Sequence, residues 1–150
     1  MIRFQANRTS SCAIAHSNNE RVTIIIHRQR GRRQTRTVKK ILIVDDDKSI
    51  RRLIERQLAA EGFDVASCGN ADDAIEWFSS NGVPDLLVTD VKMPGLSGPE
   101  LYEHLKTSYD HFPVLFISGY TGDTSVQTIN PLLDKPFSRA DLIAAVNDAL

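Results

Sequence analysis

Five polar side chains follow short apolar runs of the sequence and could together handle a phosphoryl group. They are Asp45, Asp46, Asp90, Ser118 and Lys135. Three carboxylates placed close together repel one another and raise one another's pKa unless a cation neutralises them. Mg²⁺ does this in many proteins, because it binds through one or two carboxylates together with phosphate oxygens. A lysine and a hydroxyl can hold the remaining phosphoryl oxygens, and Asp90 could then act as a nucleophile that forms an aspartyl phosphate.

Asp90, the proposed nucleophile, is the central residue of this hypothesis. It ends the apolar run at residues 86–88, and Pro94 and Gly95 end any regular structure shortly after it. A carboxylate at the carboxyl end of a buried strand lies where open α/β sheets place their chemistry. The alternative is that Asp90 only begins a turn, because Asp is a common turn residue.

The other polar residues also have simpler interpretations. Asp47, the last residue of the aspartate triplet, is expected to cap the helix that follows it. Ser118 could be a turn hydroxyl, and Lys135 could be a surface charge. Their coincidence at the ends of successive apolar runs favours a shared site.

Strand and helix patterns alternate through the last three quarters of the chain. Strands are expected at residues 41–44, 63–66, 85–89, 113–117 and 131–134. This alternation predicts an α/β fold, a doubly wound five-stranded parallel sheet with helices on both faces. In such a sheet, residues just beyond the strand carboxyl ends meet at one crevice.

Capping residues mark where the helices should begin and end. The signals are Gly62 after the first helix, Asn70 before the second, Ser97 with Glu100 before the third, and Ser138 with Asp141 before the last. In the first helix, apolar residues recur at helical spacing, and Arg51 is assigned to the opposite, solvent-facing side. Residues 121–130 would form one short, poor helix.

The charge distribution divides the chain into two segments. Residues 1–40 hold ten Lys or Arg and one acidic residue, whereas residues 41–150 hold eight basic and eighteen acidic residues. We expect a basic, mostly disordered N-terminal extension at residues 1–37 and a folded domain at residues 38–150. The arginine-rich run at residues 28–33 could contact nucleic acid or another anionic surface. It could equally be a solvated tail, or sequence translated upstream of the true start.

Composition restricts the cellular setting. Two isolated cysteines, Cys12 and Cys68, form neither a disulfide framework nor a metal site, so a cytoplasmic protein is expected. No apolar run approaches the roughly 20 residues that span a bilayer. The apolar run at residues 22–26 is too short for the core of a signal peptide.

From about residue 38 to residue 150, the chain resembles the receiver domain of two-component response regulators. The matching motifs are residues 43–47 (Ile-Val-Asp-Asp-Asp), 88–95 (Val-Thr-Asp-Val-Lys-Met-Pro-Gly), 117–120 (Ile-Ser-Gly-Tyr) and 135–137 (Lys-Pro-Phe). In this order, these motifs are highly specific for the family.

The resemblance implies a role for each candidate residue. Asp90 would be the phosphoacceptor, taking a phosphoryl group from a phosphohistidine of a sensor histidine kinase or a histidine phosphotransfer protein. Mg²⁺ would be held by Asp45, Asp46, Asp90 and the backbone carbonyl of Lys92. Ser118 and Lys135 would bind the phosphoryl oxygens, and the Lys135–Pro136 peptide bond would be cis. Such a protein is not an enzyme beyond assisting its own phosphorylation and dephosphorylation.

The chain also departs from the common family pattern. Leu132 stands where many members carry an aromatic switch residue, which implies a muted or different conformational readout. The stretch between Ser118 and Lys135 is shorter than in DNA-binding members, so the dimer that many of them form is not implied here. The sequence of residues 118–120, Ser-Gly-Tyr, is more similar to that of receivers attached to hybrid sensor kinases. Tyr120 and Lys92 are predicted to slow hydrolysis of the aspartyl phosphate.

These features together indicate a stand-alone receiver that signals by binding a downstream protein or by passing the phosphoryl group onward. Neither a membrane nor nucleic acid is expected as a partner. One alternative is a Mg²⁺-dependent phosphohydrolase with an aspartate nucleophile, but such enzymes usually need a second Asp where Lys92 stands. A third hypothesis is anion or nucleic-acid binding through the arginine-rich segment.

Overall fold

The computed structural model describes residues 13–18, 21–26, 34–119 and 131–150. The chain divides into two compact units, Met1–Val38 and Lys39–Leu150. The arginine-rich run at residues 28–33 lies outside the described residues. Among the residues that are described, no helix has the length and apolar character needed to cross a bilayer.

The first unit contains three short antiparallel strands. They are β1 (Ala13–Asn18), β2 (Arg21–Ile26) and β3 (Gln34–Thr37), in the order β1-β2-β3. For these residues the structure differs from the disorder expected of residues 1–37. The β-branched run at residues 22–26 favours extended backbone and supplies the middle strand. For the rest of the segment, disorder stays a prediction.

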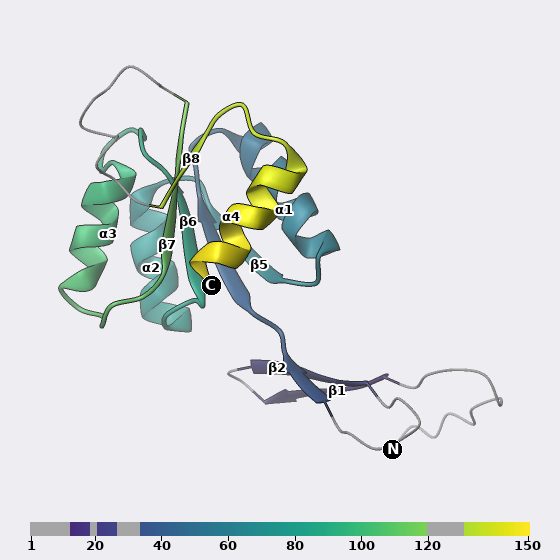
Figure 1. The fold of residues 1–150 in the computed structure, drawn as a ribbon. Coiled ribbons are helices and arrows are strands. Elements are labelled where there is room, and N and C mark those ends of the chain that lie inside the picture. Colours follow the sequence, from purple (N-terminus) through teal and green to yellow (C-terminus); the bar gives the residue numbers. More distant parts are fainter. Residues whose placement is uncertain (1–12, 19–20, 27–33, 120–130) are drawn as a thin grey trace. The chain divides into compact units, whose positions relative to one another are not determined.

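The second unit is built on five parallel strands (Figure 1). They are β4 (Lys40–Val44), β5 (Asp64–Cys68), β6 (Leu86–Asp90), β7 (Val114–Ser118) and β8 (Leu132–Asp134). Their order in the sheet is β5-β4-β6-β7-β8. The doubly wound parallel sheet predicted from the sequence is therefore confirmed, with its topological switch between β4 and β6.

Four described helices cover the two faces of this sheet. They are α1 (Lys48–Ala60), α2 (Ala71–Asn81), α3 (Gly98–Lys106) and α4 (Arg139–Ala149). Helices α1 and α4 lie on one face, and α2 and α3 lie on the other (Figure 1). The short helix predicted at residues 121–130 lies outside the described residues.

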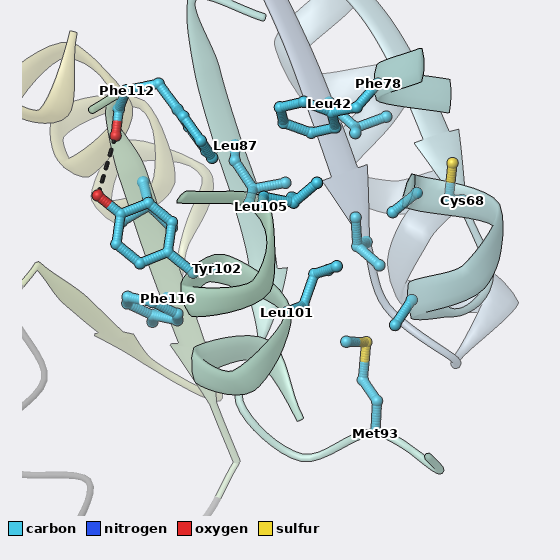
Figure 2. Packing of buried hydrophobic residues seen from close by; sticks show 14 of the residues in the cluster. Leu42, Cys68, Phe78, Leu87, Met93, Leu101, Tyr102, Leu105, Phe112 and Phe116 are labelled. Carbon is cyan, nitrogen blue, oxygen red and sulfur yellow. Dashed lines mark hydrogen bonds between the residues drawn. The ribbon is translucent and has the colours of Figure 1, made fainter. Parts of the chain in front are cut away.

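Two buried clusters hold the helices to the sheet. Along β4, Leu42 and Val44 belong to the cluster under α2 and α3, whereas Ile41 and Ile43 belong to the cluster under α1 and α4. This alternation explains why a strand buried on both faces reads as an unbroken apolar run. In the first cluster, shown in Figure 2, the hydroxyl of Tyr102 donates to the carbonyl of Phe112 at 3.2 Å.

The helix caps follow the sequence signals. Asn70, Ser97 and Ser138 cap α2, α3 and α4, and the last two form complete capping boxes. At the end of α1, Gly62 has φ +90°, a conformation that residues with a side chain rarely adopt. These caps fix where each helix begins or ends, and so they position the loops at the strand ends.

Candidate functional site

The predicted site residues occupy the carboxyl edge of the parallel sheet. Asp90 is the last residue of β6, and Ser118 is the last residue of β7. Asp45 follows β4 directly, and Lys135 follows β8. The strands are parallel neighbours, so these four residues emerge at the same edge, on both sides of the topological switch.

The ammonium group of Lys135 joins the two buried carboxylates. Its Nζ atom donates to Asp45 Oδ2 at 2.9 Å and to Asp90 Oδ1 at 2.6 Å. The side chains of Asp45 and Asp90 are only 3% and 9% exposed, and that of Lys135 is 19% exposed. Lys135 is therefore part of the site and not a surface charge.

The backbone around Lys135 directs this side chain inward. The Lys135 N–H donates to the carbonyl of Ser118 at 2.6 Å, which ties the end of β8 to the end of β7. The Lys135–Pro136 peptide bond is cis, as the family resemblance implies. Ser118 is itself buried, as are Asp45 and Asp90 at the same edge of the sheet.

Backbone amides hold the second oxygen of each buried carboxylate. The Asp47 N–H donates to Asp45 Oδ1 at 2.8 Å, and the Lys92 N–H donates to Asp90 Oδ2 at 3.0 Å. Each carboxylate thus has one oxygen on Lys135 and the other on a loop amide. The orientation of both groups is fixed before any ligand binds.

Burial sets the electrostatics of this site. It raises the pKa of Asp90 above its usual value; the hydrogen bond and charge of Lys135 only partly oppose this effect, and the nearby charge of Asp45 adds to it. For Lys135, burial by itself would lower the pKa. The hydrogen bonds and charges of Asp90 and Asp45 outweigh that effect, so the pKa of Lys135 is raised. The ammonium group is therefore charged at neutral pH.

Asp46 does not join the other two carboxylates. Its side chain is exposed, and no group of three or more carboxylate, imidazole or thiol side chains among the described residues is arranged to hold a metal ion. In this conformation the cation that neutralises Asp45 and Asp90 is Lys135. The donors nevertheless suit Mg²⁺, because two converging carboxylates with a third beside them in the chain offer the hard oxygen ligands that this ion prefers.

The third aspartate of the triplet has the structural role predicted for it. Asp47 caps α1, and its side chain accepts the N–H groups of Ser49 and Ile50. Lys92 contributes its N–H to the site, while its side chain is exposed. Tyr120 lies outside the described residues. Leu132 is partly buried against the cluster under α2 and α3, beside Phe116 of the neighbouring strand.

Sequence reasoning missed two residues that shape the site. Arg51, which was assigned to the solvent-facing side of the first helix, is half-buried and donates from Nη1 to the carbonyl of Asp45 at 2.5 Å. Gly98 lies so close to β6 that an added Cβ atom would fall 2.2 Å from the carbonyl oxygen of Asp90. Neither contact has a signal in the sequence, because both join segments whose approach depends on the packed fold.

Comparisons with known proteins place the chain in one family. The family model of the response regulator receiver domain matches residues 41–147. The DNA-binding transcriptional regulator NtrC of Escherichia coli is 31% identical over 115 residues, which cover 73% of this chain and 24% of NtrC. The autoinducer 1 sensor kinase/phosphatase LuxN of Vibrio harveyi is 30% identical over 110 residues, which cover 73% of this chain and 13% of LuxN. The chain thus spans a quarter or less of these relatives.

A solved structure extends the similarity to three dimensions. The response regulator TrrA of Thermotoga maritima, in complex with Mg²⁺-BeF, has a TM-score of 0.66 and 29% identity, covering 75% of this chain and 100% of that one. Residues 41–147, which the family model matches, include all the strand-end residues described above. The chain therefore belongs to the family of response regulator receiver domains of two-component systems.

Proposed function

We propose that the protein accepts a phosphoryl group on Asp90 in a two-component phosphorelay. The observation that supports this most directly is the position of Lys135, whose ammonium group bridges Asp90 to Asp45 at the carboxyl edge of the sheet. A cation held against the nucleophile is also placed to bind the oxygens of an arriving phosphoryl group. Asp90 is the last residue of its strand and its side chain is 9% exposed, so a donor would approach it at this edge of the sheet.

The chemical step is an in-line displacement at phosphorus. A carboxylate oxygen of Asp90 attacks the phosphorus of a phosphohistidine, and the new O–P bond forms as the N–P bond breaks. The electron pair of that N–P bond returns to the imidazole of the donor. Lys135 and the hydroxyl of Ser118 bind the phosphoryl oxygens, and the Lys92 N–H holds the second carboxylate oxygen in place.

The residues fit a Mg²⁺ ion at this site. Asp45, Asp46, Asp90 and the backbone carbonyl of Lys92 would hold it, and the bound ion would offset the negative charge that gathers during transfer. The complex of TrrA with Mg²⁺-BeF supports this part of the proposal. In the present conformation, Lys135 occupies one oxygen of each buried carboxylate, so its side chain must share them with the ion.

We also infer the kind of partners. The donor would be a sensor histidine kinase or a histidine phosphotransfer protein, and the signal would pass to a downstream protein by binding or by onward transfer. The similarity to part of a protein named as a sensor kinase/phosphatase supports this inference. The protein would act only on its own aspartyl phosphate, in the cytoplasm, and would turn over no separate substrate.

Intact mass spectrometry with a small phosphodonor tests the proposal. The protein is incubated with acetyl phosphate in the presence and absence of Mg²⁺, and one phosphoryl adduct is expected only with Mg²⁺. Asp90→Asn should form none. Asp85→Asn is the matched control, because Asp85 stands just before the first residue of β6, at the end of the strand far from the site. Its carboxylate accepts a hydrogen bond from the Lys40 N–H at 2.8 Å. An adduct that persists in Asp90→Asn, or one lost equally in Asp85→Asn, would refute the assignment.

A further inference from the structure

Arg51 binds the aspartate loop at residues 45–47 through two hydrogen bonds. The Arg51 guanidinium donates to the carbonyl of Asp45 at 2.5 Å, and the Arg51 backbone N–H donates to the carbonyl of Asp47 at 3.0 Å. One residue of α1 thus holds both ends of the loop. The Asp47 N–H also bonds Asp45 Oδ1 inside the loop.

The bond to Asp45 matters because of the peptide unit to which its carbonyl belongs. That unit joins Asp45 to Asp46, so its orientation sets the direction in which each of the two side chains leaves the backbone. Asp45 is buried toward Lys135 and Asp46 is exposed. Rotation of this peptide would move both carboxylates at once.

Gly69 provides the space for the guanidinium. A Cβ atom at this position would lie 3.3 Å from Arg51 Nη1 and 3.5 Å from Arg51 Cζ. The first of these contacts is tighter than an ordinary van der Waals contact, so a side chain there would displace the guanidinium by a few tenths of an ångström. The same loop is attached to this region by the Asp45 N–H, which donates to the carbonyl of Cys68 at 3.3 Å.

We propose that Arg51 is a positioning residue for Mg²⁺ binding, which orients the Asp45–Asp46 peptide from the space that Gly69 leaves open. This inference rests on the proposed function, because it assigns Arg51 a role toward the ion that the phosphoacceptor site would hold. Arg51 would not itself be a ligand of the ion or of the phosphoryl group. It acts by fixing the two carboxylates that would bind the ion, as outer residues commonly do at metal sites.

Coulomb's law alone predicts the opposite effect. Arg51 carries a positive charge near an acidic site, so its removal should favour a bound cation if charge were its only contribution. If Arg51 orients the carboxylates, its removal should weaken Mg²⁺ binding. The sign of the change therefore separates positioning from simple charge.

The test is isothermal titration calorimetry of the full chain with Mg²⁺, without a phosphodonor. Arg51→Gln should raise the dissociation constant of Mg²⁺ by about tenfold, the loss typical when a residue behind a metal ligand is removed. Gly69→Ala should shift it in the same direction by a smaller factor. Arg51→Lys retains one donor and the charge, and should recover part of the loss.

Arg52→Gln is the matched control, because it removes the same charge from the next, exposed position of α1. It should leave Mg²⁺ binding unchanged or slightly tighter. At saturating Mg²⁺, Arg51→Gln should regain most of the wild-type rate of adduct formation with acetyl phosphate. A purely structural role would lower the melting temperature without this recovery.

Two results of the calorimetry would also overturn the inference while leaving the proposed function intact. One is unchanged or tighter Mg²⁺ binding in Arg51→Gln, and the other is an equal loss in Arg52→Gln. A wild-type chain that neither binds Mg²⁺ nor forms the phosphoryl adduct would instead refute the proposed function, and this inference with it.

Discussion

At the scale of single residues, the site is organised by competition for two buried carboxylates. Lys135 takes one oxygen of Asp45 and one of Asp90, and loop amides take the others. Such a pair of buried acids is stable only with a cation close by. The same lysine would then serve two states, as the counter-ion of the free site and as a ligand of the phosphoryl oxygens.

Substitution of Lys135 should make the stability of the protein depend on Mg²⁺. Lys135→Gln leaves Asp45 and Asp90 without their cation, so the free energy of unfolding should fall by about 3 kcal/mol in the absence of the ion. Added Mg²⁺ should restore most of it and should bind more tightly than in wild type. Thermal unfolding with and without Mg²⁺ checks this, with Lys92→Gln as a control at an exposed lysine beside the site. An equal, Mg²⁺-independent loss in both variants would disprove it.

The charged carboxylate of Asp90 is expected to lower the free energy of unfolding at neutral pH. Its pKa is raised in the folded protein, so folding favours the protonated carboxyl and the charged form is disfavoured. Asp90→Asn should therefore raise the free energy of unfolding at pH 7 by roughly 1 kcal/mol, a size usual for single substitutions.

The pH dependence of that gain gives a second check. As the pH falls through the raised pKa of Asp90, the wild-type carboxyl takes up a proton and loses its disadvantage. The difference in melting temperature between Asp90→Asn and wild type should shrink from pH 7 to about pH 4. A difference that is constant with pH, or a less stable Asp90→Asn at pH 7, would show that burial does not govern this carboxyl.

At the scale of elements, local chemistry predicted most of the fold and less of the site. The five parallel strands were expected from apolar runs, and the caps at Asn70, Ser97 and Ser138 from residue type alone. These signals lie within a few residues of one another, which is why they can be read from the chain. The strands β6 and β7 begin and end one residue later than expected, so they include Asp90 and Ser118 themselves.

The features that sequence reasoning missed depend on how the chain folds back on itself, which residue type and spacing do not indicate. Arg51 belongs to the polar stripe of α1 by periodicity, yet its guanidinium reaches back over the loop to Asp45. The position of Asp46 away from the other carboxylates likewise follows from how that loop is held. The strands of the first unit were missed because only the short β-branched run at residues 22–26 indicates them in the sequence.

Gly98 provides an element-scale prediction, because α3 begins where β6 leaves no room for a side chain. A Cβ atom at Gly98 would lie 2.2 Å from the carbonyl oxygen of Asp90 and 3.1 Å from Thr89 Cγ2. Gly98→Ala should therefore lower the free energy of unfolding by about 2 kcal/mol and slow adduct formation, because either α3 or Asp90 must move.

Gly82→Ala is the control for this prediction. Gly82 has φ +77° and ψ −166°, a conformation essentially restricted to glycine, and no atom lies within 4 Å of an added Cβ, so backbone strain of about 1–3 kcal/mol without a steric contact is expected there. Chemical denaturation and the rate of adduct formation with acetyl phosphate measure both effects. If Gly98→Ala forms the adduct as fast as Gly82→Ala does, the contact between Gly98 and Asp90 does not position the nucleophile.

At the scale of the whole molecule, the second unit should hold everything that the chemistry needs. Both buried clusters and all the described site residues lie within Lys39–Leu150. A chain that begins at Lys39 keeps the ion pair of Lys39 with Asp85 and the bond from the Lys40 N–H to the same carboxylate.

Removal of residues 1–38 should therefore change the free energy of unfolding by less than about 1 kcal/mol, because it removes none of the buried apolar side chains of the described core. Acetyl phosphate should still give one Mg²⁺-dependent adduct. Denaturant unfolding and intact mass of the two chains measure this. A shortened chain that unfolds, or that takes no phosphoryl group, would show that the first unit is part of the receiver.

The most direct test of the central claim is to locate the phosphoryl group by chemical trapping. Borohydride reduces an acyl phosphate to an alcohol, so an aspartyl phosphate becomes homoserine at the modified position. After incubation with acetyl phosphate and Mg²⁺, peptide mass spectrometry should find homoserine at residue 90 and at no other aspartate. Homoserine at Asp45 or Asp46, or an adduct that borohydride does not convert, would contradict the assignment of Asp90 as the phosphoacceptor.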